Sequence, residues 1–247
     1  MLREFVLLRA GECLIDQSQL LTGTAVGKML RVPIWMYLLR GDDALLLVDT
    51  GMPPECVGNP RFFADEEDGD QIQPQMRPDD AVDRVLGRVG LRAEDLDGVI
   101  STHWHFDHAG GNRLLRAAPL LVHREEAQSF ATEDPPPWVD LQREMRYVVD
   151  GEQPMPGVQF LHTPGHTPGH LSLLLTLPSS RPILLTIDAC YTARNWAENV
   201  PGAMADAERG MRSVARLREI AQAASATVFF GHDAAQAGEE QWGALAR

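Results

Sequence analysis

Hydrophobic residues fall into short runs that end at turn-forming or polar positions. Residues 32–51, VPIWMYLLRGDDALLLVDTG, contain two apolar runs separated by Gly-Asp-Asp. This pattern predicts two strands joined by a turn, the second ending at Asp49. Residues 53–80 are instead rich in proline, glycine and acids, apart from the pair Phe62-Phe63. We predict a long loop here, and loops of this length are usually functional or mobile.

Other apolar residues recur at helical spacing. The clearest case has four apolar positions on one helix face and a glycine as the expected stop: Val82, Val85, Leu86, Val89 and Gly90. Residues 96–102, LDGVIST, read as a short buried strand. Further helices are predicted over residues 110–119, 138–148 and roughly 206–224.

The later chain repeats one pattern three times, an apolar strand followed by a polar residue. VQFLHTPGH leads to His166, PILLTID to Asp188 and TVFFGH to His232. Sheets in α/β proteins build sites from residues just past their strand ends, because a rigid sheet brings together positions far apart in sequence. We therefore expect these three side chains to share a site.

Composition narrows the class of protein. The 247 residues carry a net charge of −13, which argues against a nucleic-acid backbone as partner. The three cysteines form no disulfide framework or zinc knuckle. Charge interrupts the N-terminus, MLREFVLLRA, too early for a signal-peptide core, and no apolar run has the length of a membrane span. No linker divides the chain. We expect a single cytoplasmic domain over residues 1–247, with no membrane and no nucleic acid as partner.

The stretch THWHFDHAGGN, residues 102–112, concentrates the candidate chemistry. In an extended segment His103, His105 and Asp107 share one face, and His108 turns to a neighbouring point. Imidazoles with carboxylates suit zinc, iron, manganese or cobalt and need no thiolate. A solvated polar loop is the simpler alternative. A polar loop does not explain why His166, Asp188 and His232 also follow apolar strands. We expect these three residues at the same centre.

These motifs resemble the metallo-β-lactamase superfamily. HWHFDH, TPGHTPGH, LLTIDACYT and FFGHD are similar to its signature, and together with VDTGMP they are most similar to the N-acyl-homoserine lactone lactonases of the quorum-quenching class. The resemblance implies an α/β fold, an αββα four-layer sandwich of two mixed sheets packed face to face. It also implies two divalent metal ions at one edge of the sandwich. Zinc is the expected metal, and iron, cobalt and manganese are the alternatives.

The resemblance assigns the ligands residue by residue. It implies a first metal held by His103, His105 and His166, a second held by Asp107, His108 and His232, and a bridging Asp188. The implied reaction is attack of a metal-bridging hydroxide on the carbonyl of an N-acyl-homoserine lactone. Tyr191 would stabilise the oxyanion and Asp107 would protonate the departing ring oxygen. A homodimer is common in this branch.

Other residues receive supporting assignments. Phe106, Phe63 and residues 20–30 are candidates for the substrate pocket, with plain packing as the alternative. Asp49 orients a ligand through hydrogen bonds or caps a turn. His170 supports the site or caps a loop. The remaining assignments are Cys190 to the core, and His123 and His162 to ordinary polar roles.

Rival functions stay open at this stage, because one fold supports many reactions. Another lactone, such as 4-pyridoxolactone, would need the same metals, and Tyr191 favours a lactone over a thioester. From a different class, a diiron redox protein would use similar ligands. Such a protein normally needs a flavin domain, for which 247 residues leave no room.

Overall fold

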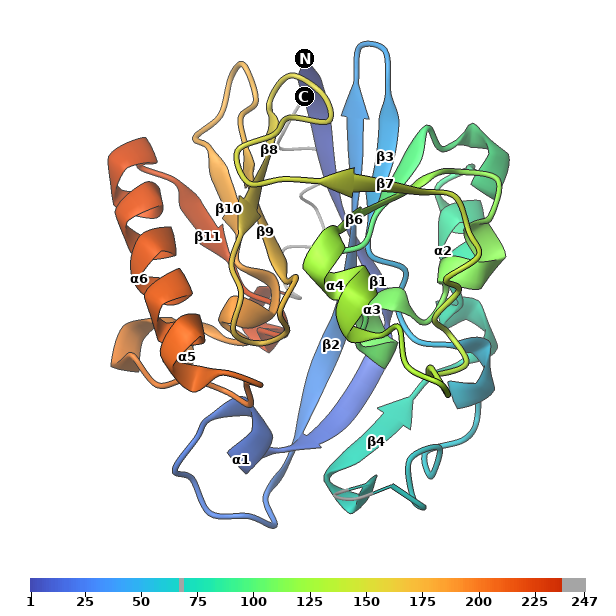
Figure 1. Cartoon of the computed structure of the whole chain (residues 1–247), viewed down its shortest axis with the longest axis vertical. Coiled ribbons are helices and arrows are strands. Elements are labelled where there is room, and N and C mark those ends of the chain that lie inside the picture. Colours follow the sequence, from blue (N-terminus) through green and yellow to red (C-terminus); the bar gives the residue numbers. More distant parts are fainter. Residues whose placement is uncertain (67–68, 237–247) are drawn as a thin grey trace.

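Two β-sheets face each other in the computed structural model, which describes residues 1–66 and 69–236. The first sheet has the order β4-β1-β2-β3-β5-β6-β7 and the second the order β11-β10-β9-β8. Helices α2 and α4 lie outside the first sheet, and α5 and α6 lie outside the second (Figure 1). This is the expected αββα sandwich.

The strands of the first sheet are β1 (Leu2–Asp16), β2 (Met29–Gly41), β3 (Leu45–Val48), β4 (Ile72–Gln75), β5 (Gly98–Ile100), β6 (Leu120–His123) and β7 (Met145–Val148). Those of the second are β8 (Val158–His162), β9 (Leu171–Leu175), β10 (Ile183–Leu185) and β11 (Thr227–Phe229). The helices are α1 (Gln17–Leu20), α2 (Val82–Arg88), α3 (Phe106–Ala109), α4 (Arg124–Ser129), α5 (Ala193–Glu198) and α6 (Ala207–Ala224).

Both sheets are mixed. Strands β4, β1, β2 and β3 pair antiparallel, whereas β3, β5, β6 and β7 pair parallel. In the second sheet β10 and β11 are parallel and the other pairs are antiparallel. The carboxyl ends of β5, β8, β10 and β11 are each followed by a predicted site residue.

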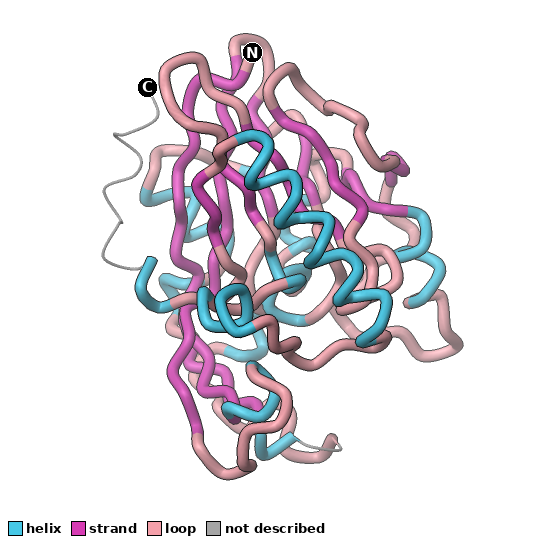
Figure 2. Tube along the Cα trace, turned by 90° about the vertical axis from the view of Figure 1, so that its left-hand side faces the viewer, coloured by secondary structure: helices cyan, strands magenta, loops and turns pink. Residues whose placement is uncertain are grey.

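Apolar side chains fill the space between the sheets and beneath the helices. The inner core includes Phe5, Tyr37, Phe160 and Phe229, which come from both sheets. Burying such side chains is the main force that holds the layers together. Helix α6 packs Leu217 on the outer face of the second sheet and crosses its strands in Figure 2.

Several predicted elements are confirmed. The strands on either side of Asp42 and Asp43 pair antiparallel as β2 and β3. Helix α6 begins after Asp206, whose side chain accepts a hydrogen bond from the N–H of Arg209. Helix α2 occupies the expected segment, but it ends at Arg88 and leaves Val89 40% exposed, so Val89 is not part of the buried face.

The helix predicted over residues 138–148 is wrong. The segment is a loop followed by β7, which pairs with β6. Within it the buried Arg143 donates hydrogen bonds to the carbonyl oxygens of Asn112, Leu115 and Ala118. These long-range bonds and the pairing with β6 outweigh the local helical pattern.

Two further differences are smaller. Residues 110–119 form only a short 3-10 helix, Asn112–Leu115, before β6. The long loop after Pro53 contains β4, which adds to the edge of the first sheet through β1. Among the described residues, no helix combines the length and the hydrophobicity that crossing a bilayer requires.

Candidate metal centre

The segment after β5 changes conformation between its histidines. His105, which precedes α3, still has an extended backbone, and its carbonyl oxygen accepts hydrogen bonds from the N–H groups of His108 and Ala109. Asp107 therefore lies on a helical turn, and the expected common extended face does not include it. The turn directs Asp107 and His108 to the side of the site where His232 lies.

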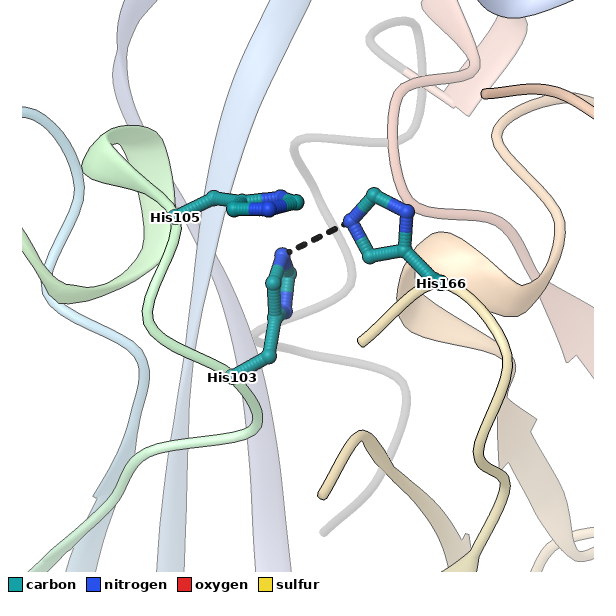
Figure 3. A group of neighbouring side chains, drawn as sticks. All are labelled: His103, His105 and His166. Atoms are coloured by element: carbon teal, nitrogen blue, oxygen red, sulfur yellow. Dashed lines mark hydrogen bonds between the residues drawn. The ribbon is translucent and has the colours of Figure 1, made fainter. Parts of the chain in front are cut away.

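All seven predicted ligand residues meet at one end of the sandwich. Their ligand atoms form three groups, and within each group they lie within 4.8 Å of one another. The groups are His103, His105 and His166; His103, His108 and Asp188; and Asp107, His108 and His232. Figure 3 shows the first group, in which His103 and His105 come from one segment and His166 faces them from another.

The ring nitrogens are oriented as metal ligands require. The Nδ1 atoms of four histidines lie beside oxygen atoms, at 3.2 Å (His103 to Thr102 Oγ1), 2.9 Å (His108 to Asp49 Oδ2) and 3.0 Å (His166 to Ala203 O and His232 to Pro33 O). Protons at Nδ1 leave the Nε2 lone pairs free to face the centre.

The distances between the nitrogens agree with this assignment. The Nε2 atoms of His103 and His166 lie 3.1 Å apart, and those of His108 and His232 lie 3.4 Å apart. Tetrahedral zinc with bonds of about 2.0–2.1 Å separates neighbouring ligand nitrogens by about 3.4 Å. The pairs are thus spaced as ligands of shared ions.

Asp188 occupies the middle of the cluster. Its Oδ1 atom is buried and has no hydrogen-bond partner among the described residues, although it lies 3.4 Å from His108 Nε2 and 3.3 Å from His232 Nε2. Its Oδ2 atom lies 3.4 Å from His166 Nε2. An orphaned carboxylate oxygen among imidazoles costs free energy unless a cation neutralises it. The donor set therefore fits divalent metal ions.

The electrostatics divide the cluster into two halves. Burial lowers the pKa values of His103, His105 and His166, so these imidazoles are neutral and available as ligands. Burial opposes charge at His108 too, but the carboxylates of Asp188 and Asp107 raise its pKa well above the usual range. The half of the cluster that contains Asp107, His108 and His232 thus attracts positive charge, which either protons or a metal ion can supply.

Asp49 positions His108 from behind. It is fully buried, adopts a left-handed backbone conformation (φ +58°), and accepts hydrogen bonds from the N–H and the hydroxyl of Thr102 at 2.9 and 2.8 Å. Its other contact is the Nδ1 of His108. This contact agrees with the expected orienting role of Asp49, which stays a prediction. A non-glycine residue at positive φ stores strain that the surrounding contacts must outweigh.

His170 supports Asp188. Its Nε2 accepts the backbone N–H of Asp188 at 3.1 Å, and its Nδ1 lies 2.9 Å from the hydroxyl of Thr163. The ring is fully buried, and burial lowers its pKa to about 3, so it stays neutral. This agrees with the supporting role expected for it.

A cavity of about 890 Å³ opens onto the cluster. His105, Asp107, Asp188 and Tyr191 lie in its wall, and aromatic and aliphatic side chains form much of the rest: Leu20, Phe62, Phe63, Trp104, Phe106, Phe130 and Trp138. Phe63 and Phe106 pack edge to face with ring centroids 4.5 Å apart. The predicted pocket residues therefore line the cavity as well as packing on each other. Of the segment 20–30, Leu20 reaches it.

Tyr191 lies at the border between the polar cluster and the apolar wall. Its hydroxyl donates to the carbonyl oxygen of Ala203 at 3.0 Å and lies 3.1 Å from Nδ1 of His166. Burial raises its pKa well above the usual value. The hydroxyl therefore remains protonated and can donate a hydrogen bond.

The remaining predictions concern residues outside the centre. Cys190 is buried in a small core with Val214 and Phe230, as expected. His123 and His162 lie outside the centre, with their rings stacked 3.8 Å apart. Sequence reasoning did not identify Trp138, which lines the cavity and donates its indole N–H to the carbonyl oxygen of Trp104. Its position beside the proline run 135–137 carried no functional signal.

Known proteins share this architecture. A family model described as the metallo-beta-lactamase superfamily matches residues 30–232. The chain is 41% identical to an N-acyl homoserine lactonase of a Bacillus species over 92% of both chains. It is also 38% identical to the N-acyl homoserine lactonase AiiA of Bacillus thuringiensis subsp. kurstaki, over 95% of this chain and 94% of the relative.

One solved structure has a bound product. It is an N-acyl homoserine lactone hydrolase with N-hexanoyl-L-homoserine at its catalytic metal centre. It superimposes with a TM-score of 0.93 at 37% identity and covers 97% of this chain, which in turn covers 96% of that one. The fold, the ligand geometry and these similarities agree, and the chain belongs to the metallo-β-lactamase superfamily.

Proposed function

We propose that this chain is a metal-dependent hydrolase that opens the ring of N-acyl homoserine lactones. One observation carries the proposal: a cluster of five histidines and two aspartates, a protonated tyrosine hydroxyl and an apolar cavity all meet in one pocket. A lactone with an acyl chain needs each of these three parts. The relatives named above act on the same class of substrate.

Two divalent metal ions are proposed for the cluster. His103, His105 and His166 would hold one, Asp107, His108 and His232 the other, and Asp188 would contact both. Metal ions in such a site lower the pKa of bound water and polarise an ester carbonyl. We propose zinc, and this donor set also accepts iron, cobalt or manganese.

The chain's own side chains would handle the charge and the proton. Tyr191 would turn its hydroxyl hydrogen away from the carbonyl oxygen of Ala203 and donate it to the oxygen on which negative charge develops as the lactone carbonyl is attacked. Asp107 is mostly buried and lies in the wall of the cavity, so its carboxyl group is within reach of a ring oxygen bound there. We propose that it takes up a proton from the attacking water and passes this proton to the leaving oxygen.

The apolar part of the cavity would hold the acyl chain. Phe63 and Phe106 form one wall, and Leu20 contributes to the lining from α1. The stabilisation from apolar contacts scales with the buried area, so such a pocket accepts acyl chains of different length. The net charge of −13 argues against nucleic acid as a partner. A homodimer, a single domain and a cytoplasmic location stay predictions.

Proton release during ring opening provides the test. Metal-analysed protein is given homoserine lactones with short and long acyl chains, with 4-pyridoxolactone, a β-lactam and a glutathione thioester alongside. We expect rapid turnover of the acyl-homoserine lactones that is lost on chelation and restored by metal. Turnover of another substrate alone would overturn the substrate assignment. Two bound metals with no hydrolysis would favour the diiron redox alternative.

A further inference from the structure

A buried carboxylate lies between the two segments that carry the first group of histidines. Glu126, in α4, is completely buried, and no arginine, lysine or histidine pairs with it within the described ranges 1–66 and 69–236. Instead it accepts three hydrogen bonds. A buried charge without a cation is costly and persists only where donors surround it.

The three donors come from both sides of the metal centre. Oε1 accepts the backbone N–H of Trp104 at 2.7 Å. Oε2 accepts the hydroxyl of Thr167 at 2.7 Å and the N–H of Gly169 at 3.0 Å. Trp104 lies between His103 and His105, and Thr167 follows His166. One carboxylate therefore ties the segment that carries two histidines to the loop that carries the third. Figure 3 shows these two segments and their histidines facing each other.

Neighbouring contacts make this connection rigid. The carbonyl oxygen of Trp104 accepts the indole N–H of Trp138 at 3.0 Å, so the residue between the two histidines is fixed through both of its backbone polar groups. On the other side, a Cβ atom at Gly169 would lie 2.2 Å from the backbone nitrogen of Glu126. Only glycine allows α4 to approach the His166 loop this closely.

We propose that Glu126 is a positioning residue that sets the spacing between His103, His105 and His166 and thereby the affinity and geometry of the first metal site. The proposal rests on the metal centre of the proposed function. Residues that orient metal ligands from outside typically change metal affinity or activity by about 10–100-fold when they are replaced. The Glu126 carboxylate orients two segments at once, the one that carries His103 and His105 and the one that carries His166.

The chemistry of the donors explains why an acid is needed. All three groups donate, and an ionised carboxylate only accepts. Burial raises the pKa of Glu126 to about 7, and the three hydrogen bonds oppose this rise. In Glu126→Gln, the amide NH₂ would face either the N–H of Trp104 or the donors of the His166 loop. One of the two segments would then lose its anchor.

Metal retention and a spectroscopic signature test the proposal without any substrate. Glu126→Gln and Thr167→Val are loaded with two equivalents of zinc and titrated with a chelator, and the visible absorption of their cobalt forms is recorded. Glu125→Gln is the matched control, because Glu125 is the neighbouring residue and its carboxylate contacts Arg209 on the surface instead. The unchanged chain is the reference.

We expect Glu126→Gln to hold the zinc ion of the first site about 10–100-fold less tightly and to show a shifted cobalt spectrum. At saturating zinc its kcat should fall about tenfold while KM stays within about twofold. Thr167→Val should weaken zinc by a smaller factor, and it decides the question if Glu126→Gln does not fold. Glu125→Gln should match the parent in zinc affinity and in spectrum.

Unchanged zinc affinity and an unchanged cobalt spectrum in the folded variants would overturn the proposal, even if their thermal stability fell. A weakened site in a protein that opens no lactone would have a different meaning. It would refute the proposed substrate and leave the role of Glu126 intact, because neither zinc affinity nor the cobalt spectrum depends on turnover.

Discussion

Two groups of histidines lie in this molecule, and they are built in different ways. In the metal centre the rings of His103, His105 and His166 stand nearly perpendicular to one another, with interplanar angles of 80° to 90°. The rings of His123 and His162 are instead stacked at 18°. Perpendicular rings can direct lone pairs to one point, whereas stacked rings direct theirs along parallel lines.

The surroundings differ as well. Acceptors at Nδ1 fix four histidines of the centre, and an orphaned carboxylate oxygen lies among them. The carboxylate near the stacked pair, Glu125, already contacts Arg209. His162 donates from Nε2 to the carbonyl oxygen of Pro168, which serves a loop rather than a ligand. Proximity of histidines is therefore not sufficient for a metal site. Convergence of lone pairs and unsatisfied charge are also needed.

Removing one side chain from each group should give the largest contrast. His105→Ala or Asp188→Ala should lower the metal content and reduce lactone turnover below detection, because each removes a ligand. His123→Asn, which keeps an N-cap for α4, should retain both the metal content and the lactone turnover of the parent. Elemental analysis and turnover on the same preparations measure this. Full activity in metal-depleted His105→Ala would contradict the dinuclear mechanism.

A smaller loss is expected when the ligands stay and a hydrogen-bond donor is removed. Tyr191→Phe should keep both metals and slow turnover by about one to three orders of magnitude, as for one oxyanion donor. Rates at saturating substrate, with metal content as the control, decide the point. If the rate did not change, Tyr191 would return to a packing role.

Weakening the support of a ligand should have a more modest effect. In Asp49→Asn the side chain no longer offers a carboxylate to Nδ1 of His108, so the orientation of this ring is less well fixed. We expect affinity for the second metal to fall about tenfold. Competition with a chelator measures the loss. Asp42→Asn, at an exposed ion pair with Arg3, should change nothing and serves as the control.

The stacked pair should contribute only a weak dependence of stability on pH. Burial lowers the pKa of His123 below 6.5, His162 and Arg209 lower it further, and Glu125 and Asp150 oppose them. The unfolded chain therefore takes up this proton first as pH falls, and stability is lost below about pH 6.5. The metal-loaded parent should lose more Tm between pH 7 and 5.5 than His123→Asn. Equal losses of Tm in the two proteins would show that His123 does not contribute to the dependence of stability on pH.

Sequence reasoning identified residues that the structure brings together better than it identified the framework around them. Strand-end positions and the resemblance identified His166, Asp188 and His232, because these residues follow apolar strands. The conformation of Asp107 was misjudged, since the turn of α3 depends on hydrogen bonds to His105 rather than on alternation. The helix predicted over residues 138–148 failed because Arg143 and β7 are held by distant partners.

Glu126 shows the limit most clearly. Its local sequence, HREEAQ, is an ordinary polar helix start, and two adjacent glutamates read alike. One is buried and bonds to both segments that carry the first group of histidines, and the other contacts Arg209. Their roles diverge only through contacts with residues 20 to more than 80 positions away. A pattern along the chain cannot distinguish them.

The proposed ligands are divided between the two sheets: His103 to His108 follow a strand of the first sheet, and His166, Asp188 and His232 follow strands of the second. Bound ions would therefore fasten the two halves together, and the halves could not separate without releasing them. By mass action, the lifetime of the protein against proteases would then follow the supply of free metal. In a cell short of metal the enzyme would be degraded as well as inactive, and its abundance would follow the metal supply of the cell.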